Sequence, residues 1–194
     1  MSSKKQGILY IDGENLKHYI KKILEKHSKI KSFVEIDLNL LLASALETID
    51  IRDRRFYSAK VRLHPSFEKK SNELIQKQRK LKTLLEKQGF YFVIGGNVRG
   101  QKVSVNGKEK IVFHEKGVDV KLAVDMVSDA CDKKVETIIL CSSDSDLQPA
   151  VSEVKKRGAE IIYLGFESQP NKGLIYTCNR SILIRDAEIL KAFK

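Results

Sequence analysis

The chain opens with a short apolar run, Ile8-Leu9-Tyr10-Ile11, that stops at a carboxylate, Asp12. Four apolar residues between polar neighbours are typical of a buried parallel strand, and Gly13 supplies the tight turn after it. Apolar residues then recur at helical spacing to about Lys26. We therefore predict a strand that ends at Asp12 and leads directly into an amphipathic helix.

The same pattern of a strand followed by a helix recurs along the chain. Further apolar runs predict strands at 55–58, 90–94, 137–141, 160–164 and 181–184. Helical periodicity predicts helices at about 37–48, 65–89, 116–131, 147–158 and 187–193. The helix at 116–131 is apolar almost all round, so we expect it to be buried against the sheet. Alternating strands and helices predict an α/β fold with a mostly parallel sheet, and residues 1–194 are expected to form one domain.

Residues 97–115 interrupt this alternation. Asn106-Gly107 lies between two stretches of alternating residues and is the strongest hairpin signal in the chain. The preceding glycines at 95, 96 and 100 are spaced as in a phosphate-binding loop, but the Lys-Ser/Thr of such a loop is absent, so no nucleotide site is predicted. The hairpin is basic and either clamps a nucleic-acid backbone or is an inert insertion; its cations include Arg99, Lys102, Lys108 and Lys110.

A second strand also delivers carboxylates, because the 137–141 run is followed by Ser142-Ser143-Asp144-Ser145-Asp146. Asp119 lies in the first turn of the 116–131 helix, where the helix dipole favours an anion. Asp12 and Asp146 also suit the simpler role of a helix cap, which for Asp12 alone explains the residue as well as a functional site does. The carboxyl ends of parallel strands share one edge, so five polar residues are predicted to converge there: Asp12, Asn15, Asp119, Asp144 and Asp146.

Packed carboxylates repel one another unless a cation neutralises them. Ligands that are all oxygens indicate Mg²⁺ or Mn²⁺ rather than zinc, and the four histidines show no metal-ligand spacing. Such an ion can activate water toward a phosphodiester. Asp125 is rotated about 120° from Asp119 around the helix, so we predict that it either supports the ligands of the site or is structural.

The charge points to a polyanionic partner. Lys and Arg number 36 against 25 Asp and Glu, a net charge of +11, which favours RNA or DNA. Lys70, Lys77 and Lys80 form either a phosphate-facing ridge or, more simply, the solvated face of a helix. The three cysteines have no CxxC spacing and are expected to be reduced core residues. No apolar run is long enough to span a membrane, and we expect a cytoplasmic protein.

The segments IDGEN, KGVDVKLAVDM and SSDSD resemble the three acidic motifs of NYN-domain proteins, in the LabA-like branch of the PIN-like nucleases. The resemblance covers most of the chain. It implies a three-layer α/β/α sandwich, with the 97–115 hairpin as an insertion, and cleavage of RNA, rather than DNA, that depends on Mg or Mn. Ser143 and Leu147 depart from the third motif, which commonly has a glycine and an aromatic residue at those positions.

By motif position the resemblance assigns catalysis and metal binding to one set of aspartates: Asp12, Asp119, Asp144 and Asp146. A second set of residues is predicted to bind the substrate: Asn15, Ser143, Arg99, Lys102 and Lys116. Two other functions stay open. A noncatalytic RNA-binding module can keep the nuclease fold without the activity. A phosphatase with Asp144 as nucleophile is also possible in principle, but no motif supplies the lysine that such chemistry needs.

Overall fold

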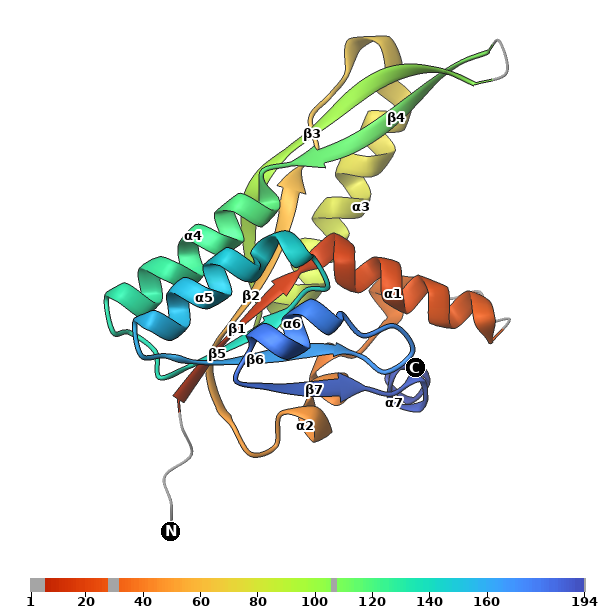
Figure 1. Cartoon of the computed structure of the whole chain (residues 1–194). Coiled ribbons are helices and arrows are strands. Elements are labelled where there is room, and N and C mark those ends of the chain that lie inside the picture. The colour runs from red at the N-terminus through yellow and green to blue at the C-terminus, as the bar shows by residue number, and fades with distance from the viewer. Residues whose placement is uncertain (1–5, 28–31, 106–107, 194) are drawn as a thin grey trace.

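The computed structural model describes residues 6–27, 32–105 and 108–193 (Figure 1). In this part of the chain seven strands form one sheet, in the order β4-β3-β2-β1-β5-β6-β7. The strands are β1 (Gln6–Asp12), β2 (Asp50–Lys60), β3 (Tyr91–Val105), β4 (Lys108–Lys116), β5 (Thr137–Cys141), β6 (Glu160–Phe166) and β7 (Arg180–Ile184). Neighbouring strands run parallel, except that β3 and β4 are antiparallel.

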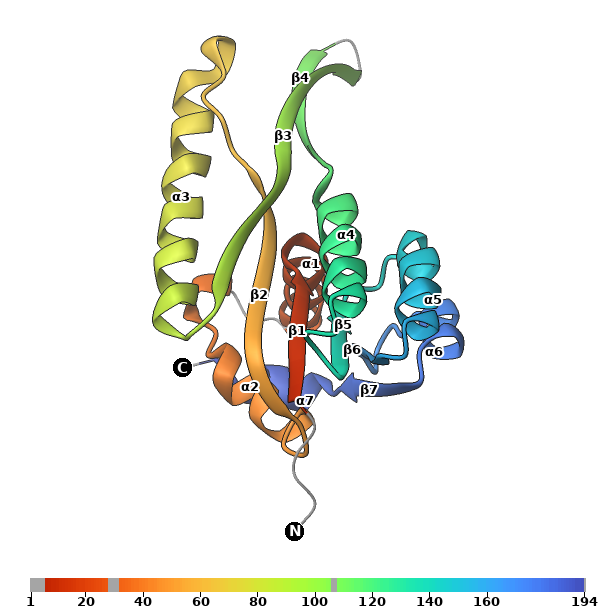
Figure 2. The same cartoon turned by 90° about the vertical axis from the view of Figure 1, so that its left-hand side faces the viewer.

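The longer helices pack on the two faces of this sheet (Figure 2). The α-helices are α1 (Gly13–Lys26), α2 (Leu38–Ala45), α3 (Glu68–Lys87), α4 (Val118–Cys131), α5 (Gln148–Lys156), α6 (Lys172–Thr177) and α7 (Asp186–Lys191). Short 3-10 turns are η1 (Phe33–Glu35), η2 (Pro65–Phe67) and η3 (Ser145–Leu147).

Two hydrophobic cores, one on each face, hold the three layers together. Leu9 and Ile11 of β1 point into the core shared with α1, α2, α3 and α7. Ile8 and Tyr10, which alternate with them, point into the core beneath α4, α5 and α6. Because β1 buries both faces, it lies in the middle of the sheet, between β2 and β5. The predicted three-layer α/β/α fold with a mostly parallel sheet is confirmed.

The basic hairpin is continuous with the sheet, because the predicted strand at 90–94 runs on as β3 into the antiparallel pairing with β4. Residues Asn97–Val105 pair with Lys108–Lys116. The three glycines that resemble a phosphate loop lie within β3, and a Cβ at Gly96 would collide with the carbonyl of Lys116. They permit close backbone approach, as glycine in a strand often does. The predicted turn residues Asn106 and Gly107 lie outside the described part of the chain.

Most predicted elements are present, with some corrections. The strand predicted at 55–58 extends over Asp50–Lys60, and the helix predicted to run to residue 48 ends at Ala45. The pattern did not predict α6. The predicted burial of α4 against the sheet is confirmed for one face, which includes Leu122 and Met126, whereas Val120 and Val124 are 61% and 54% exposed. Only one face of α4 meets the sheet, and none of the described elements covers those valines.

The three cysteines differ in exposure. Cys141 and Cys178 are buried as predicted, but Cys131, at the last turn of α4, is exposed rather than part of the core. All three thiols are free. None of the described helices combines the length and apolar character that crossing a bilayer requires.

Candidate functional site

The central strand β1 carries Asp12 to the carboxyl edge of the sheet. Asp12 caps α1, because its Oδ1 accepts a hydrogen bond from the Asn15 backbone N–H at 3.1 Å. Its second oxygen, Oδ2, accepts from the Ser142 hydroxyl at 3.2 Å. Gly13 is needed here since a Cβ would meet the Phe56 ring. Capping and membership of a polar cluster are therefore compatible roles for this one carboxylate.

The neighbouring strand β5 brings the second acidic motif to the same place. Cys141 pairs with Ile11, so Ser142 follows at the level of Asp12. The Ser142 hydroxyl, which donates to Asp12, also accepts from the Asp144 backbone N–H at 3.2 Å. Asp144 then caps η3, where its Oδ1 accepts from the Asp146 N–H at 2.9 Å. Ser142 thus joins the two acidic motifs, a role that the sequence did not reveal.

The predicted substrate-binding residues Asn15 and Ser143 bond to each other. The Ser143 N–H donates to the Asn15 side-chain oxygen at 3.0 Å. The Ser143 carbonyl accepts from Asn171 Nδ2 at 2.9 Å, and its hydroxyl lies 3.0 Å from the Tyr163 hydroxyl. These bonds lock the loop after β5 to α1 and to the start of α6. Asn15 and Ser143 therefore position the acidic residues.

Charge repulsion and burial act together on Asp12. Burial raises the pKa of its carboxyl group, and the negative charges of Asp144 and Glu14 raise it further, against the lowering effect of the Asn15 and Ser142 hydrogen bonds. Among the described residues no Lys, Arg or His forms an ion pair with Asp12 or Asp144. The ionised form of Asp12 is consequently destabilised in the folded protein, and a bound cation would offset this loss of free energy.

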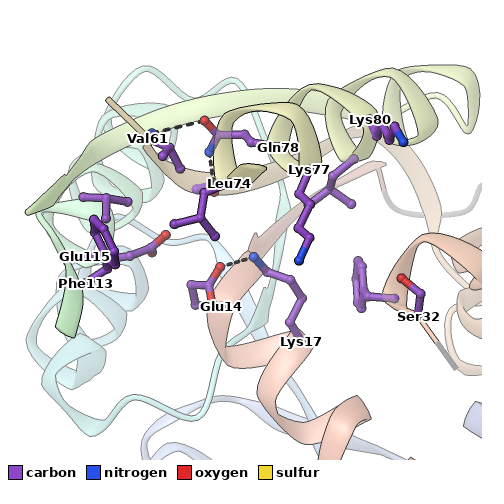
Figure 3. Close-up of a pocket in the computed structure, with 14 residues that line it drawn as sticks. Glu14, Lys17, Ser32, Val61, Leu74, Lys77, Gln78, Lys80, Phe113 and Glu115 are labelled. Atoms are coloured by element: carbon purple, nitrogen blue, oxygen red, sulfur yellow. Dashed lines mark hydrogen bonds and ion pairs between the residues drawn. The ribbon is translucent and has the colours of Figure 1, made fainter. Parts of the chain in front are cut away.

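Two glutamates that the sequence analysis missed extend this acidic region. Glu14 follows Asp12 closely and forms an ion pair with Lys17. Glu115, near the end of β4, accepts a hydrogen bond from the Ala59 N–H at 3.3 Å. Burial, followed by repulsion from Glu14, raises the pKa of Glu115 to about 7. Figure 3 shows Glu14 and Glu115 on the same side of one cavity, although they come from α1 and β4.

The remaining predicted residues are more exposed. Asp119 lies in the first turn of α4, which begins directly after Gly117 in the left-handed conformation. α4 starts at the end of the sheet toward which β1 points (Figure 2). Asp146, Arg99 and Lys116 are exposed and form no described bond through their side chains to Asp12. The side chain of Lys102 lies outside the described part of the chain. The structure therefore joins Asp12, Asn15 and Ser143 through direct hydrogen bonds, and Ser142 links Asp144 to Asp12.

The donor chemistry of this edge suits a hard divalent cation. Within residues 6–27, 32–105 and 108–193, no three His, Cys, Asp or Glu side chains are grouped so that they could hold a metal ion. Mg²⁺, however, is commonly bound through one or two carboxylates and keeps several of its waters. Asp12 and Asp144, linked through Ser142, fit that mode of binding.

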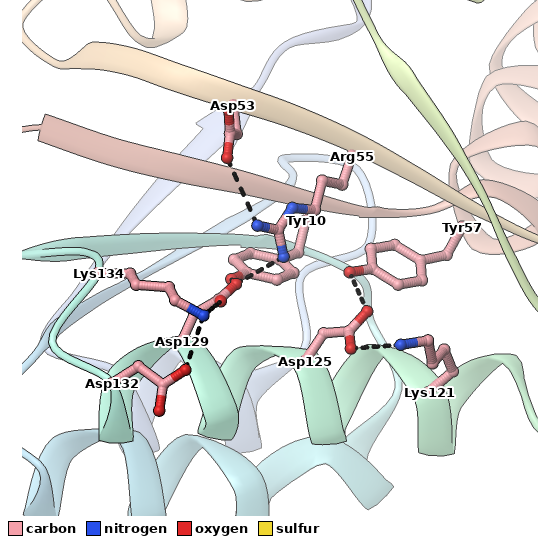
Figure 4. A network of polar contacts seen from close by, with 9 residues as sticks. All are labelled: Tyr10, Asp53, Arg55, Tyr57, Lys121, Asp125, Asp129, Asp132 and Lys134. Atoms are coloured by element: carbon pink, nitrogen blue, oxygen red, sulfur yellow. Dashed lines mark hydrogen bonds and ion pairs between the residues drawn. The ribbon is translucent and has the colours of Figure 1, made fainter.

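The other acidic residues of α4, Asp125 and Asp129, each have a cationic partner and a hydrogen bond from a tyrosine of the sheet (Figure 4). The Tyr57 hydroxyl donates to Asp125 at 2.9 Å, and Lys121 pairs with the same carboxylate at 2.5 Å. One turn along, Asp129 accepts from the Tyr10 hydroxyl at 2.6 Å and from Arg55 at 2.5 Å. Of the two roles predicted for Asp125, these contacts favour the structural one. The Asp129 network was not predicted.

Comparison with known proteins identifies the family of this chain. The sequence profile of the NYN domain matches residues 8–185. No curated protein matches the chain. Among solved structures, a protein of unknown function from Vibrio parahaemolyticus is similar, with a TM-score of 0.63 and 18% sequence identity over 95% of each chain. At that identity the likeness supports the fold alone.

Proposed function

The chain belongs to the NYN domain family, a PIN-like family associated with ribonuclease activity, and from that premise we propose that it is a metal-dependent ribonuclease. The observation that carries the proposal is the pair of carboxylates at the ends of the central strands. Asp12 and Asp144 share the Ser142 hydroxyl as a hydrogen-bonding neighbour and repel each other. The LabA-like branch is part of the same proposal and rests on the three acidic motifs.

In this mechanism Asp12 and Asp144 hold Mg²⁺ or Mn²⁺. When bound, the ion supplies a water of lowered pKa and charge stabilisation at the phosphate. Asn15 and Ser143 keep the two carboxylates in place through their mutual hydrogen bond. Asp119 and Asp146, exposed around the same edge, orient water, and the cations Arg99, Lys102 and Lys116 contact backbone phosphates of RNA.

A noncatalytic RNA-binding module is the second candidate. It is favoured by the lack, among the described residues, of a group of three metal-ligating side chains. The two functions share the basic surface and differ in what Asp12 and Asp144 do.

The test measures the cleavage of a labelled single-stranded RNA with Mn²⁺, Mg²⁺ or chelator. We expect cleavage by the wild type with an ion and a loss on the order of 100-fold in Asp12→Asn and Asp144→Asn, which keep the side-chain shape but remove a ligand charge. Asp132→Asn is the matched control, since Asp132 is exposed and pairs with Lys134 beyond the far end of α4. Binding without cleavage in every ion, or equal cleavage by all variants, would assign the chain to the noncatalytic module.

A further inference from the structure

A cavity of about 630 Å³ opens beside the acidic edge, between α1, α3 and the β3–β4 pair (Figure 3). Sites for small organic groups commonly measure roughly 300 to 1,000 Å³, so a single nucleotide has ample room. The mechanism proposed above uses none of the residues that line this cavity. Glu14, two residues after Asp12, lines it, so an occupant of the cavity lies next to the proposed site of cleavage.

The interior of the cavity offers apolar and aromatic surface. Leu74 of α3 points into it, and Phe113 of β4 lies beside Glu115 (Figure 3). Phe33 of η1 is a third lining residue, and both phenylalanines are only partly buried. One face of Phe113 is covered by Lys70, whose Nζ lies 5.4 Å from the ring centroid. Partly exposed aromatic rings are the surfaces on which unpaired bases stack.

The rim of the cavity is positive. Lys77 and Lys80 project from α3, and Figure 3 shows the Lys77 side chain extending toward Lys17 of α1. Both α3 lysines are exposed, and neither forms an ion pair within the described part of the chain. Lys17, by contrast, is already paired with Glu14. Lys77 and Lys80 can therefore bind the two phosphates that flank a base held in the apolar cavity below them.

An apolar cavity beneath two lysines favours single-stranded over double-stranded nucleic acid. In a duplex the bases are stacked and paired, and the deep major groove of RNA keeps side chains out. Only an unpaired base can leave the stack, enter a cavity and expose its faces to Phe113 or Phe33. A duplex can contact Lys77 and Lys80 through its phosphates but cannot fill the space below them.

We propose that this cavity receives one unpaired base of single-stranded RNA, with Lys77 and Lys80 on the flanking phosphates, so that the strand leads across the Asp12–Asp144 edge. The proposal rests on the ribonuclease assignment for its choice of RNA and names single-stranded RNA as the substrate class. Glu115 closes one side of the cavity, where it can contact a polar edge of the base.

The first experiment measures RNA binding by fluorescence anisotropy in the presence of chelator, so that no cleavage occurs and the result is independent of catalysis. We expect Lys77→Gln/Lys80→Gln to weaken binding of a short single-stranded RNA about tenfold, because phosphate contacts are lost. Lys69→Gln/Lys87→Gln is the matched control: it removes the same charge from exposed positions of α3 that do not line the cavity. We expect the control to bind nearly as well as the wild type. An equal loss in both double variants would overturn the proposal in favour of general charge attraction.

The second experiment tests the base itself. A series of RNAs, each with one abasic position, should contain a position at which wild-type affinity falls about tenfold, the effect of losing one stacked base. Leu74→Trp, which fills the cavity, should bind intact RNA as weakly as the wild type binds that abasic RNA, and should no longer distinguish the two. If Leu74→Trp fails to fold, as its melting curve would reveal, the abasic series and the lysine variants decide.

Two further ligands complete the test. The same sequence as a duplex should bind less tightly and respond equally to both lysine pairs. No effect of any abasic position, or a duplex that binds as tightly as the single strand, would overturn the base pocket. Equal affinity for single-stranded DNA would overturn the choice of RNA. Failure of the ribonuclease assignment would instead be recorded as absent cleavage with normal discrimination in these binding experiments.

Discussion

Acidic residues occupy two regions near β1, and the protein treats them in opposite ways. Beneath α4, Asp125 and Asp129 accept hydrogen bonds from Tyr57 and Tyr10, and each has a cationic partner. At the carboxyl edge, Asp12 and Asp144 accept hydrogen bonds from neutral donors and repel each other. The carboxylates beneath α4 are already neutralised by their cationic partners. The carboxylates at the edge keep a negative charge that a bound cation could neutralise.

The region beneath α4 shows what a structural carboxylate looks like in this fold. Arg55 lies over the Tyr10 ring at 5.3 Å and donates to Asp129, which is 7% exposed. Burial and the bond to Asp129 raise the pKa of the Tyr10 hydroxyl, so Tyr10 stays a proton donor. Every group of this network has a partner, and the network fixes α4 on the sheet. The position of Asp119 at the start of α4 depends on it.

The largest expected difference comes from removing a charge in that network. Asp129→Asn leaves Arg55, which is 21% exposed, without its principal anion, and we expect the free energy of unfolding to fall by about 3 kcal/mol. Urea denaturation measures the loss. Asp132→Asn, which changes an exposed neighbour of Lys134, is the control and should alter stability little. Equal stability of the two variants would show that the network beneath α4 is not structural and would remove the contrast with the edge.

The sequence predicted one of these regions and not the other. Asp12 and Asp144 were predicted because each follows a local apolar run, and the carboxyl ends of parallel strands share an edge whatever the strand order. The contact of Tyr10 with Arg55 depends on register, since these two residues are partners on β1 and β2. Strand order and register are set by the tertiary packing of both faces, so the local pattern could not reveal them.

Glu115 was missed for a related reason. It lies 56 residues from Ala59, whose N–H it accepts, and its proximity to Glu14 arises only when β4 folds back along β3. In the sequence it is one acidic residue in a basic hairpin. Asn171 could have been found, because it follows β6 at the carboxyl edge and caps α6, which repeats the logic that identified Asp12. The helix it caps is short, and its periodicity is correspondingly weak.

At the carboxyl edge we expect the opposite: removing the charge of Asp12 should stabilise the fold, and by less than the loss at Asp129. The pKa of Asp12 is raised, so its ionised form destabilises the fold as pH rises through that pKa. Asn caps a helix as well as Asp does. Asp12→Asn should therefore raise the melting temperature at neutral pH without metal, by roughly 3 °C for about 1 kcal/mol. Thermal melts measure it.

Metal addition sharpens the same comparison. Millimolar Mn²⁺ should raise the melting temperature of the wild type, because an ion bound to the folded state stabilises it, and should do so less in Asp12→Asn. Asp132→Asn should respond to Mn²⁺ as the wild type does. A loss of stability in Asp12→Asn, together with an unchanged response to Mn²⁺, would place Asp12 with the structural carboxylates.

The smallest effect concerns Glu115 and appears as a pH dependence. The pKa of Glu115 is 4.5 in the unfolded chain and about 7 in the folded protein. Protonated Glu115 therefore contributes its full stabilisation below pH 4.5, and this contribution is lost as the pH rises from 4.5 to 7. Glu115→Gln can still accept the Ala59 N–H bond but carries no charge. Because solvent reaches part of this side chain, we expect the variant to exceed the wild type by only about 1 kcal/mol above pH 7, with the difference vanishing below pH 4.5. Urea denaturation across pH 4 to 8 measures it, with Glu68→Gln on the exposed side of α3 as the control. A pH-independent difference would mean that Glu115 acts by packing, and would separate it from the repelling carboxylates of the edge.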